Sequence, residues 1–233
     1  MRPLLQKITK SLRYRASDIA YAVLPRRQVI KAYGYFTYTL NAITWRLMGR
    51  YYGSGGVLYR GGVVDFVLSH VQEGERVLDI GCAEGYLTLP ISKKAGAVVG
   101  IDIEQRYIDS IDTRDFCNTT FIRGDALTAH FDGTFDVAVA VHTLEHVKEA
   151  PALLRRLSAI ARRIIVETPA ERSDWLTQML NDMRIDDLGD DTHYALYGRD
   201  SLKTLLEANG WHDVSAWEER GLVRALGRSE AAA

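Results

Sequence analysis

The chain has 233 residues, of which 47% are hydrophobic and 25% are charged, and its formal net charge is −1. This length suits one sizeable α/β core with an appendage, and the near-zero net charge by itself points to no class of partner. The two cysteines, Cys82 and Cys117, lack metal-ligand spacing. A disulfide framework is therefore disfavoured, and we expect a cytoplasmic protein.

Residues 1–60 are basic and aromatic, and we predict that they form a separate helical arm or lid. They hold eleven Lys and Arg residues against one acid, Asp18, and ten of the 22 aromatic residues. The first apolar residues recur at helical spacing beside basic ones, which is typical of a docked helix and also of a helix on a membrane surface. No continuous apolar run suggests a signal peptide or a membrane span. Packing on the main domain is favoured, with nucleic-acid binding and peripheral membrane contact as alternatives.

Residues 61–233 alternate strand-like and helix-like segments, which is the pattern of a parallel sheet with crossover helices. We predict one domain with an α/β fold, a Rossmann-like, doubly wound, seven-stranded and mostly parallel sheet. The predicted strands are 76–79, 97–102, 119–125, 135–141, 162–169, 214–217 and 222–226. Helices are predicted over 86–94 and 202–211, the second with its stop at Gly210.

The sequence RVLDIGCAEGYL carries the most specific local signal. A strand runs into a glycine-containing turn and then a helix, which brings backbone N–H groups close to a ligand. The spacing Gly81-x-x-x-Gly85, with Ala83 between, differs from the GxGxxG of dinucleotide binders, and no GxxxxGK[ST] phosphate loop occurs. Asp102 ends the next strand 23 residues after Asp79, where an acid can bond ribose hydroxyls. We therefore expect the nucleoside part of a cofactor without its phosphates.

These motifs, taken in order, resemble the class I S-adenosylmethionine-dependent methyltransferases. VLDIGCAEG is similar to that family's first motif, VVGIDI to its ribose-binding motif, IRGDA to its adenine-side motif and FDVAVAVHTLEHV to its fourth. The resemblance covers about residues 61–217 and implies S-adenosylmethionine as the cofactor. Ala83 stands where many members have glycine. Because alanine is small, we expect the turn to survive with little loss of cofactor affinity.

The resemblance also implies roles for residues around the first two strands. Gly81 and Gly85 would let the backbone approach the cofactor, and Asp79 would orient its amino-acid part. Asp102 would hold the ribose hydroxyls, with Ile103 against the adenine ring.

Four further residues are expected to contact the cofactor. Asp125 would accept a hydrogen bond from the adenine amino group, although an aspartate that caps a turn or helix is the alternative. Arg60 would pair with the cofactor carboxylate, although a lone arginine is more often a solvated surface charge. Ala126 and Val141 belong to the adenine-side and fourth motifs.

The segment VHTLEHV directly follows the fourth predicted strand. Ligands in an open parallel sheet lie beyond the carboxyl ends of the strands, so His142 is expected near the methyl group. A sugar hydroxyl is a poor nucleophile and needs a general base, a metal that lowers its pKa, or both. If a helix begins at about Thr143 or Leu144, then His142, Glu145 and His146 share one face by their i, i+3 and i+4 spacing. His142 and Glu145 are therefore candidate catalytic residues.

The same segment is a candidate metal site. In the ubiquinone-precursor branch of the family, similar LEHV segments hold a divalent cation, and some saccharide O-methyltransferases of the family use magnesium. We predict Glu145 and His146 as ligands of Mg²⁺ or another divalent cation, although imidazoles suit a transition metal better. The HxxEH pattern equals an inverted zinc-protease motif, but its place in a methyltransferase series argues against a protease. The polar start of a helix remains an alternative.

An acidic stretch from Glu167 to Leu202 precedes the last predicted helix and is typical of a substrate lid. Asp191 and His193 offer polar contacts, and Tyr194 offers an aromatic surface on which a sugar could rest. A solvated acidic loop is the alternative. The repeated acids disfavour nucleic acid as a substrate by charge repulsion.

We thus expect an O-methyltransferase that acts on a hydroxyl of a saccharide or another small molecule, with a divalent cation as a candidate cofactor. A phenol or quinone precursor is the alternative acceptor. A non-catalytic methyltransferase-fold protein that binds RNA or lipid through the basic arm is the alternative from another functional class.

Overall fold

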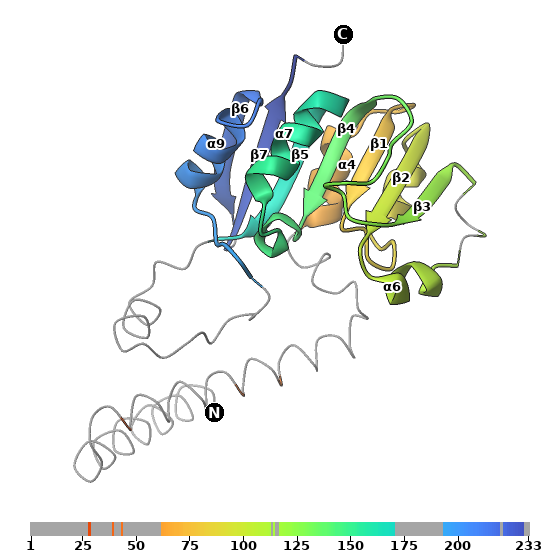
Figure 1. Ribbon diagram of the computed structural model, residues 1–233, viewed down its shortest axis with the longest axis horizontal. Coiled ribbons are helices and arrows are strands. Elements are labelled where there is room, and N and C mark those ends of the chain that lie inside the picture. The colour runs from red at the N-terminus through yellow and green to blue at the C-terminus, as the bar shows by residue number, and fades with distance from the viewer. Residues whose placement is uncertain are drawn as a thin grey trace, which may run out of the picture. The chain divides into compact units, whose positions relative to one another are not determined.

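The computed structural model describes residues 62–112, 114, 117–170, 193–219 and 221–230, together with the isolated residues 28, 39 and 43 (Figure 1). The predicted arm lies outside this part of the chain apart from those three residues. Arg60 and Asp191 also lie outside it, so their proposed contacts stay predictions. The division into an arm, 1–60, and a methyltransferase domain, 61–233, likewise stays a prediction.

The described strands form one seven-stranded, mostly parallel sheet, which confirms the predicted fold class. The elements in chain order are α4 (Val63–His70), β1 (Arg76–Ile80), α5 (Thr88–Ser92), β2 (Ala97–Asp102), α6 (Gln105–Ser110), β3 (Thr119–Arg123), β4 (Phe135–Val141), the 3₁₀ turn η2 (Leu144–His146), α7 (Ala150–Ile160), β5 (Ala161–Pro169), α9 (Arg199–Glu207), β6 (His212–Glu219) and β7 (Leu222–Arg228). The strand order is β3-β2-β1-β4-β5-β7-β6. The neighbouring strands β3, β2, β1, β4 and β5 run parallel to one another, and β7 is antiparallel to both its neighbours, β5 and β6. The order reverses between β1 and β4, so the crevice for a ligand lies at their carboxyl ends.

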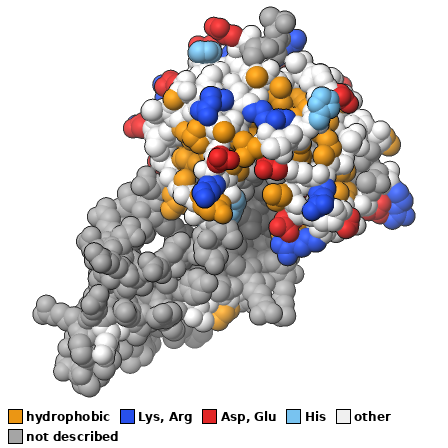
Figure 2. Space-filling view, viewed as in Figure 1, with side chains coloured by type: hydrophobic (Ala, Val, Ile, Leu, Met, Phe, Trp, Pro, Cys, Tyr) orange, Lys and Arg blue, Asp and Glu red, His pale blue; other side chains and the backbone are white. Residues whose placement is uncertain are grey.

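The central strands are buried on both faces, which explains their nearly continuous apolar sequences. In β4, every residue except Asp136 is buried. Helices α7 and α9 pack on one face of the sheet, and α4 and α5 pack on the other (Figure 1). The outer surface in the same view carries acidic and basic side chains interspersed with apolar ones (Figure 2). In the part of the chain that the structure describes, no helix has the length and apolar character needed to cross a bilayer.

The last helix, α9, begins at Arg199, three residues before the predicted start at Leu202, and it ends before Gly210. The Ser201 hydroxyl accepts the Gly198 N–H at 2.9 Å and donates to the Gly198 carbonyl at 3.1 Å, which fixes the first turn. The chain then turns through Gly210, where φ is 90°. Trp211 follows as a fully buried side chain, and its indole N–H donates to the Leu154 carbonyl at 3.2 Å.

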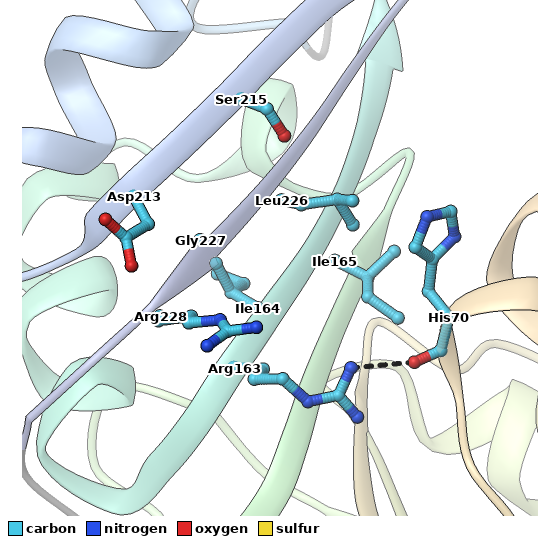
Figure 3. A pocket seen from close by; sticks show the side chains of 9 residues that line it. All are labelled: His70, Arg163, Ile164, Ile165, Asp213, Ser215, Leu226, Gly227 and Arg228. Carbon is cyan, nitrogen blue, oxygen red and sulfur yellow. Dashed lines mark hydrogen bonds between the residues drawn. The ribbon is translucent and has the colours of Figure 1, made fainter.

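A cavity lies at the opposite end of the sheet from the ligand crevice (Figure 3). It is lined by His70, Arg163, Ile164, Ile165, Asp213, Ser215, Leu226, Gly227 and Arg228. Arg163 is held there by the His70 carbonyl at 2.8 Å and by the Glu75 carboxylate at 2.6 Å. None of the predicted site residues within the described part of the chain lines this cavity.

The substitution Leu154→Ala is expected to lower the free energy of unfolding by about 2–5 kcal/mol, because it leaves a cavity in a fully packed core. Leu154 is 0% exposed and lies in the cluster under α7 and α9. The matched control is Leu205→Ala on α9, since Leu205 is only partly buried. Urea denaturation measures both variants. Equal losses of stability would contradict the assignment of Leu154 to the centre of the core.

Candidate active site

The loop between β1 and α5 takes left-handed backbone conformations at three positions. The φ angles are 72° at Gly81, 44° at Ala83 and 79° at Gly85. Glycine reaches this region without strain, whereas alanine there costs about 1–2 kcal/mol. Gly81 has a second requirement, because a Cβ atom would lie 2.5 Å from the Thr143 hydroxyl oxygen. The turn therefore forms with alanine at position 83, as expected, and the effect on cofactor affinity stays a prediction.

Asp102 at the end of β2 faces this loop. Its Oδ2 atom accepts the Ala83 N–H at 2.9 Å, and its Oδ1 atom accepts the Glu104 N–H at 2.8 Å. Each carboxylate oxygen can accept a further hydrogen bond, such as one from a ribose hydroxyl. The next side chain, Ile103, is 64% exposed and offers an apolar surface beside the carboxylate. This neighbourhood fits the nucleoside contacts that the sequence predicts.

Asp79 is the buried acid of the first motif. It is 2% exposed, and the Thr88 hydroxyl donates to its Oδ2 atom at 2.5 Å. Burial raises the pKa of Asp79 to about 6, the Thr88 hydrogen bond opposes this shift and the Asp102 charge adds to it. The carboxyl group at the end of β1 therefore changes charge close to neutral pH.

Asp125 has the turn-capping role that was the alternative to adenine binding. Its Oδ1 atom accepts the Leu127 N–H at 2.8 Å, and its carbonyl accepts the Ala129 N–H at 2.8 Å. Its side chain is exposed, so capping leaves the second carboxylate oxygen open to a ligand. Ala126 is half-buried and Val141 is buried at the end of β4.

His142 lies between two fully buried glutamates. Its backbone N–H donates to the Glu167 carbonyl at 2.8 Å, and its φ angle is 49°. Its Nδ1 atom is 3.4 Å from Oε1 of Glu145, and its Nε2 atom is 3.5 Å from Oε1 of Glu167. The imidazole is 25% exposed, whereas both carboxylates are 0% exposed. The ring thus reaches the crevice while both of its nitrogens face acidic groups.

A helical segment does follow His142, but it is a short 3₁₀ turn rather than an α-helix. The chain makes one 3₁₀ turn, Leu144–His146, and His142 precedes it with a left-handed backbone that a right-handed helix excludes. The Thr143 hydroxyl instead donates to the Ile80 carbonyl at 2.8 Å, with the Val141 carbonyl at 3.0 Å. His142 still meets Glu145. The expected single helical face that also includes His146 does not form.

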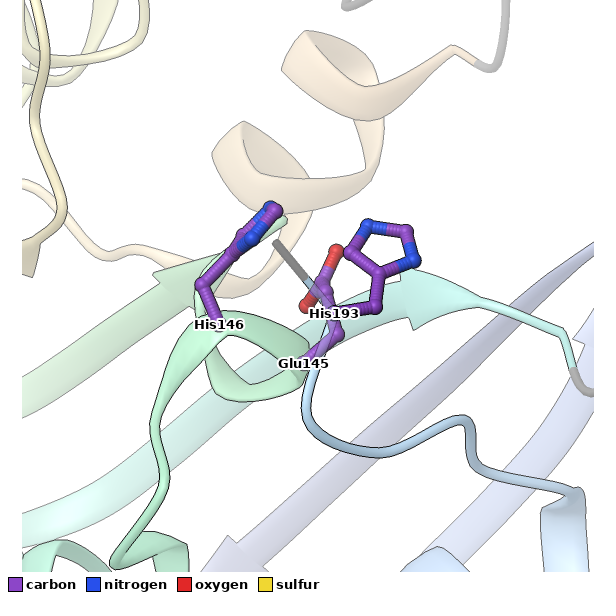
Figure 4. A group of neighbouring side chains, drawn as sticks. All are labelled: Glu145, His146 and His193. Carbon is purple, nitrogen blue, oxygen red and sulfur yellow. The ribbon is translucent and has the colours of Figure 1, made fainter. Parts of the chain in front are cut away.

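Glu145 and His146 of this turn form a group with His193 (Figure 4). One ligand atom from each residue lies within 4.8 Å of the others, and the two imidazole centroids are 4.6 Å apart. Both Glu145 carboxylate oxygens are buried without a hydrogen-bond donor among the described residues. The N–H groups of Tyr194 and Ala195 donate to the Glu145 carbonyl at 2.7 and 3.4 Å, which places His193 here. One carboxylate and two imidazoles fit a divalent transition metal.

The Glu167–Arg224 pair contains a residue that sequence patterns did not indicate. Arg224 donates from Nε to Oε2 of Glu167 at 2.7 Å, although the two residues are 57 positions apart. Burial raises the pKa of Glu167, while the hydrogen bond from Arg224 and the charge of His142 oppose the shift. Glu167 could be suspected as an acid at a strand end, whereas no local motif marks Arg224.

Comparisons with known proteins agree with this geometry. Residues 59–216, more than half of the chain, match the family model described as a methyltransferase domain. The O-antigen chain terminator bifunctional methyltransferase/kinase WbdD of Escherichia coli is 30% identical over 105 residues, which cover 39% of this chain and 15% of that protein. The ubiquinone biosynthesis O-methyltransferase of Ralstonia nicotianae is 28% identical over 94 residues, which cover 38% of this chain and 40% of that protein. Each match thus spans less than half of the relative's length.

Two solved structures show the same fold at low sequence identity. Magnesium protoporphyrin IX methyltransferase from Synechocystis, with bound S-adenosylhomocysteine (SAH), has a TM-score of 0.58 and 20% identity, and the match covers 86% of this chain and 99% of that one. The N-terminal domain of EvdMO1, in the presence of SAH and D-fucose, has a TM-score of 0.51 and 19% identity, covering 67% of this chain and 77% of that one.

The family match and the sheet order agree on the fold. Its strands β1 and β2 carry Asp79 and Asp102, and the glycine loop follows β1. The chain therefore belongs to the methyltransferase-domain family.

Proposed function

We propose that the protein methylates a hydroxyl oxygen of a saccharide or another small molecule. The observation that carries this proposal is the position of His142, which follows β4 at the ligand crevice with a buried carboxylate near each ring nitrogen. A hydroxyl must lose its proton as it attacks, and imidazole is the most common general base in proteins. A relative that is a ubiquinone biosynthesis O-methyltransferase supports an oxygen acceptor.

The residues around the β1 loop would hold the cofactor. S-adenosylmethionine supplies a methyl group that its sulfonium charge already activates. Gly81 and Gly85, with their left-handed backbone, would let the chain approach it closely, and Asp102 would accept hydrogen bonds from the ribose hydroxyls while the exposed Ile103 would cover the adenine ring. Asp79 would orient the amino-acid part. Because these groups lie on the ends of β1 and β2, the bound cofactor would point toward the end of β4 and His142.

The group Glu145, His146 and His193 would hold a divalent cation. A cation there would act as a Lewis acid that lowers the pKa of a bound hydroxyl. The nitrogen-rich ligand set favours a transition metal over Mg²⁺. His193, predicted as a substrate contact, thus becomes a candidate ligand. The neighbouring Tyr194 is 66% exposed and keeps its role as a candidate surface for the acceptor.

A phenol of a quinone precursor is the second candidate acceptor, because the relative from Ralstonia is a ubiquinone biosynthesis enzyme. A saccharide is favoured by the O-antigen relative and by the neighbour studied with D-fucose. The fold alone does not decide the chemistry, since a [4+2]-cyclase, SpnF, shares it with a TM-score of 0.57.

The first prediction separates catalysis from cofactor binding. His142→Ala is expected to keep the affinity for SAH and to lose about 10²–10⁴-fold in turnover, because it removes a general base. Asp102→Ala is expected to lose the affinity. Calorimetry with SAH and methyl transfer from radiolabelled S-adenosylmethionine to panels of saccharides and phenols measure the two effects. His130→Ala, in an exposed loop, is the matched control. Unchanged turnover in His142→Ala would remove it as the base.

The second prediction concerns the cation and uses Mn²⁺ alone as the probe. Calorimetry should detect Mn²⁺ binding to the wild-type protein. His193→Ala and Glu145→Gln should each lower the Mn²⁺ affinity at least about 10-fold. Loss of a residue that hydrogen-bonds to a metal ligand already lowers affinity by that factor, and loss of the ligand itself should lower it no less. His130→Ala should leave it unchanged. Treatment with EDTA should lower activity, and added Mn²⁺ should restore it. Full activity without cation would exclude a catalytic metal.

The third prediction is a pH dependence of cofactor affinity. Because burial raises the pKa of Asp79 to about 6, its carboxylate becomes protonated as the pH falls through that value and loses its attraction for a cationic amino group. The affinity for SAH should therefore be lower at pH 5 than at pH 8. Asp79→Asn should weaken binding at pH 8 and reduce this dependence. Equal wild-type affinities at both pH values would contradict the role of Asp79.

A further inference from the structure

Glu167 contacts His142 through both its backbone and its side chain. Its carbonyl accepts the His142 N–H at 2.8 Å, and its Oε1 atom lies 3.5 Å from the imidazole Nε2 atom. This Oε1 atom is buried and has no hydrogen-bond partner in the described part of the chain. The contact is slightly longer than a good hydrogen bond, and such catalytic contacts often tighten when ligands bind.

Arg224 fixes the orientation of that carboxylate. Glu167 on β5 and Arg224 on β7 are direct partners in the antiparallel register, and the guanidinium Nε donates to Oε2 at 2.7 Å. Arg224 is 6% exposed, also donates to Oε2 of Glu219 at 2.8 Å, and lies 4.6 Å from the centre of the Phe66 ring. A guanidinium held on several sides keeps Oε2 occupied and leaves Oε1 aimed at the imidazole.

We propose that Glu167, held by Arg224, is a positioning residue that fixes the tautomer of His142. Glu145 lies as near to the other ring nitrogen, with its Oε1 atom 3.4 Å from Nδ1, but no described donor orients its carboxylate, whereas Arg224 orients that of Glu167. In the proposed tautomer the oriented Oε1 atom of Glu167 accepts a hydrogen bond from the Nε2–H group, and Nδ1 carries the lone pair. A carboxylate behind an imidazole orients a catalytic histidine in this way in other enzymes. The inference rests on the proposed function for its chemical consequence, but the tautomer itself is a property of the free protein.

The consequence is a defined path for one proton. As the acceptor oxygen forms a bond to the methyl carbon, the carbon–sulfur bond breaks and its electron pair stays on sulfur. The acceptor proton goes to Nδ1 of His142, on the side where Glu145 lies 3.4 Å away. The imidazolium formed keeps its Nε2–H bond to Glu167. Atoms and charge balance, because the positive charge moves from sulfur to the imidazole.

A purely structural ion pair would also join β5 to β7, so a matched pair is needed as a control. Arg163 and Glu75 provide it, because Arg163 lies at the other end of β5 and contacts Glu75 at 2.6 Å. Both of its members are mostly buried, and neither is near His142. A substitution there tests whether loss of an ion pair on β5 alone changes the site.

The deciding experiment is nitrogen NMR of histidine side chains in the free protein. With ¹⁵N-labelled histidine, the signals of His142 are identified by their loss in His142→Ala. We expect the Nε2–H tautomer in the wild type and in Glu75→Gln, and a mixture of tautomers in Glu167→Gln. A wild-type Nδ1–H tautomer, or a tautomer unchanged in Glu167→Gln, would overturn the proposal. If Glu167→Gln does not fold, Arg224→Lys is measured instead and should show the same mixture, because a single ammonium lacks the guanidinium fork.

Kinetics with an acceptor found in the saccharide and phenol panels add an independent result. Glu167→Gln should lower kcat by about 10²-fold, the scale of assistance by a positioned base, with little change in the acceptor KM or in SAH affinity. Glu75→Gln should leave kcat unchanged. An equal loss in both variants would indicate a structural role only. A fixed tautomer in a protein that methylates no hydroxyl would contradict the proposed function and leave the positioning role intact.

Discussion

The Thr143 hydroxyl connects the two loops that build the active site. It donates to the carbonyl of Ile80 at the end of β1 and lies against the carbonyl of Val141 at the end of β4. It occupies the space that a side chain at position 81 would fill. Because residue 81 is glycine, the cofactor loop and the loop with His142 can approach each other closely. The distance between the proposed cofactor loop and the proposed base, His142, therefore depends on the absence of a Cβ atom at Gly81 and on the hydroxyl of Thr143.

The two buried carboxylates beside His142, Glu145 and Glu167, lower the stability of the fold. A buried carboxylate loses its hydration, and only hydrogen bonds or an opposite charge offset this loss. Glu167 has Arg224, whereas both oxygens of Glu145 lack a donor among the described residues. Natural proteins keep such unfavourable groups mainly where function requires them. A cation held by Glu145, His146 and His193 would remove the penalty at Glu145, which agrees with the role proposed for that group.

Much of the fold follows from the sequence. The strands 97–102 and 135–141 have the predicted boundaries, because their apolar, β-branched runs are limited by loop residues on both sides. The early start of α9 was missed, since it depends on the hydroxyl of Ser201 rather than on hydrophobic periodicity. The first motif predicted the position of Asp79 and the ribose-binding motif that of Asp102, because each acid lies at or next to the end of an apolar strand that the sequence indicates.

The chemistry beyond the cofactor was less accessible from the sequence. A 3₁₀ turn does begin at Leu144, but local spacing could not indicate the left-handed backbone of His142, which is held by the carbonyl of Glu167, a distant partner. The pairing of Glu167 with Arg224 depends on antiparallel register between strands far apart in the chain. The part that His193 takes in the group with Glu145 depends on backbone hydrogen bonds across a similar separation. Sequence patterns indicate local geometry, whereas these contacts form only when distant strands pair in the sheet.

The central claim is that His142 faces the methyl group across the crevice between β1 and β4. A crystal structure of the protein with SAH tests it most directly. The account predicts that the adenosine part lies against Asp102 and Ile103 and that the sulfur atom faces the His142 ring, with space for an acceptor hydroxyl between them. A sulfur atom that points away from His142, or a site with no space between sulfur and the ring, would contradict the account.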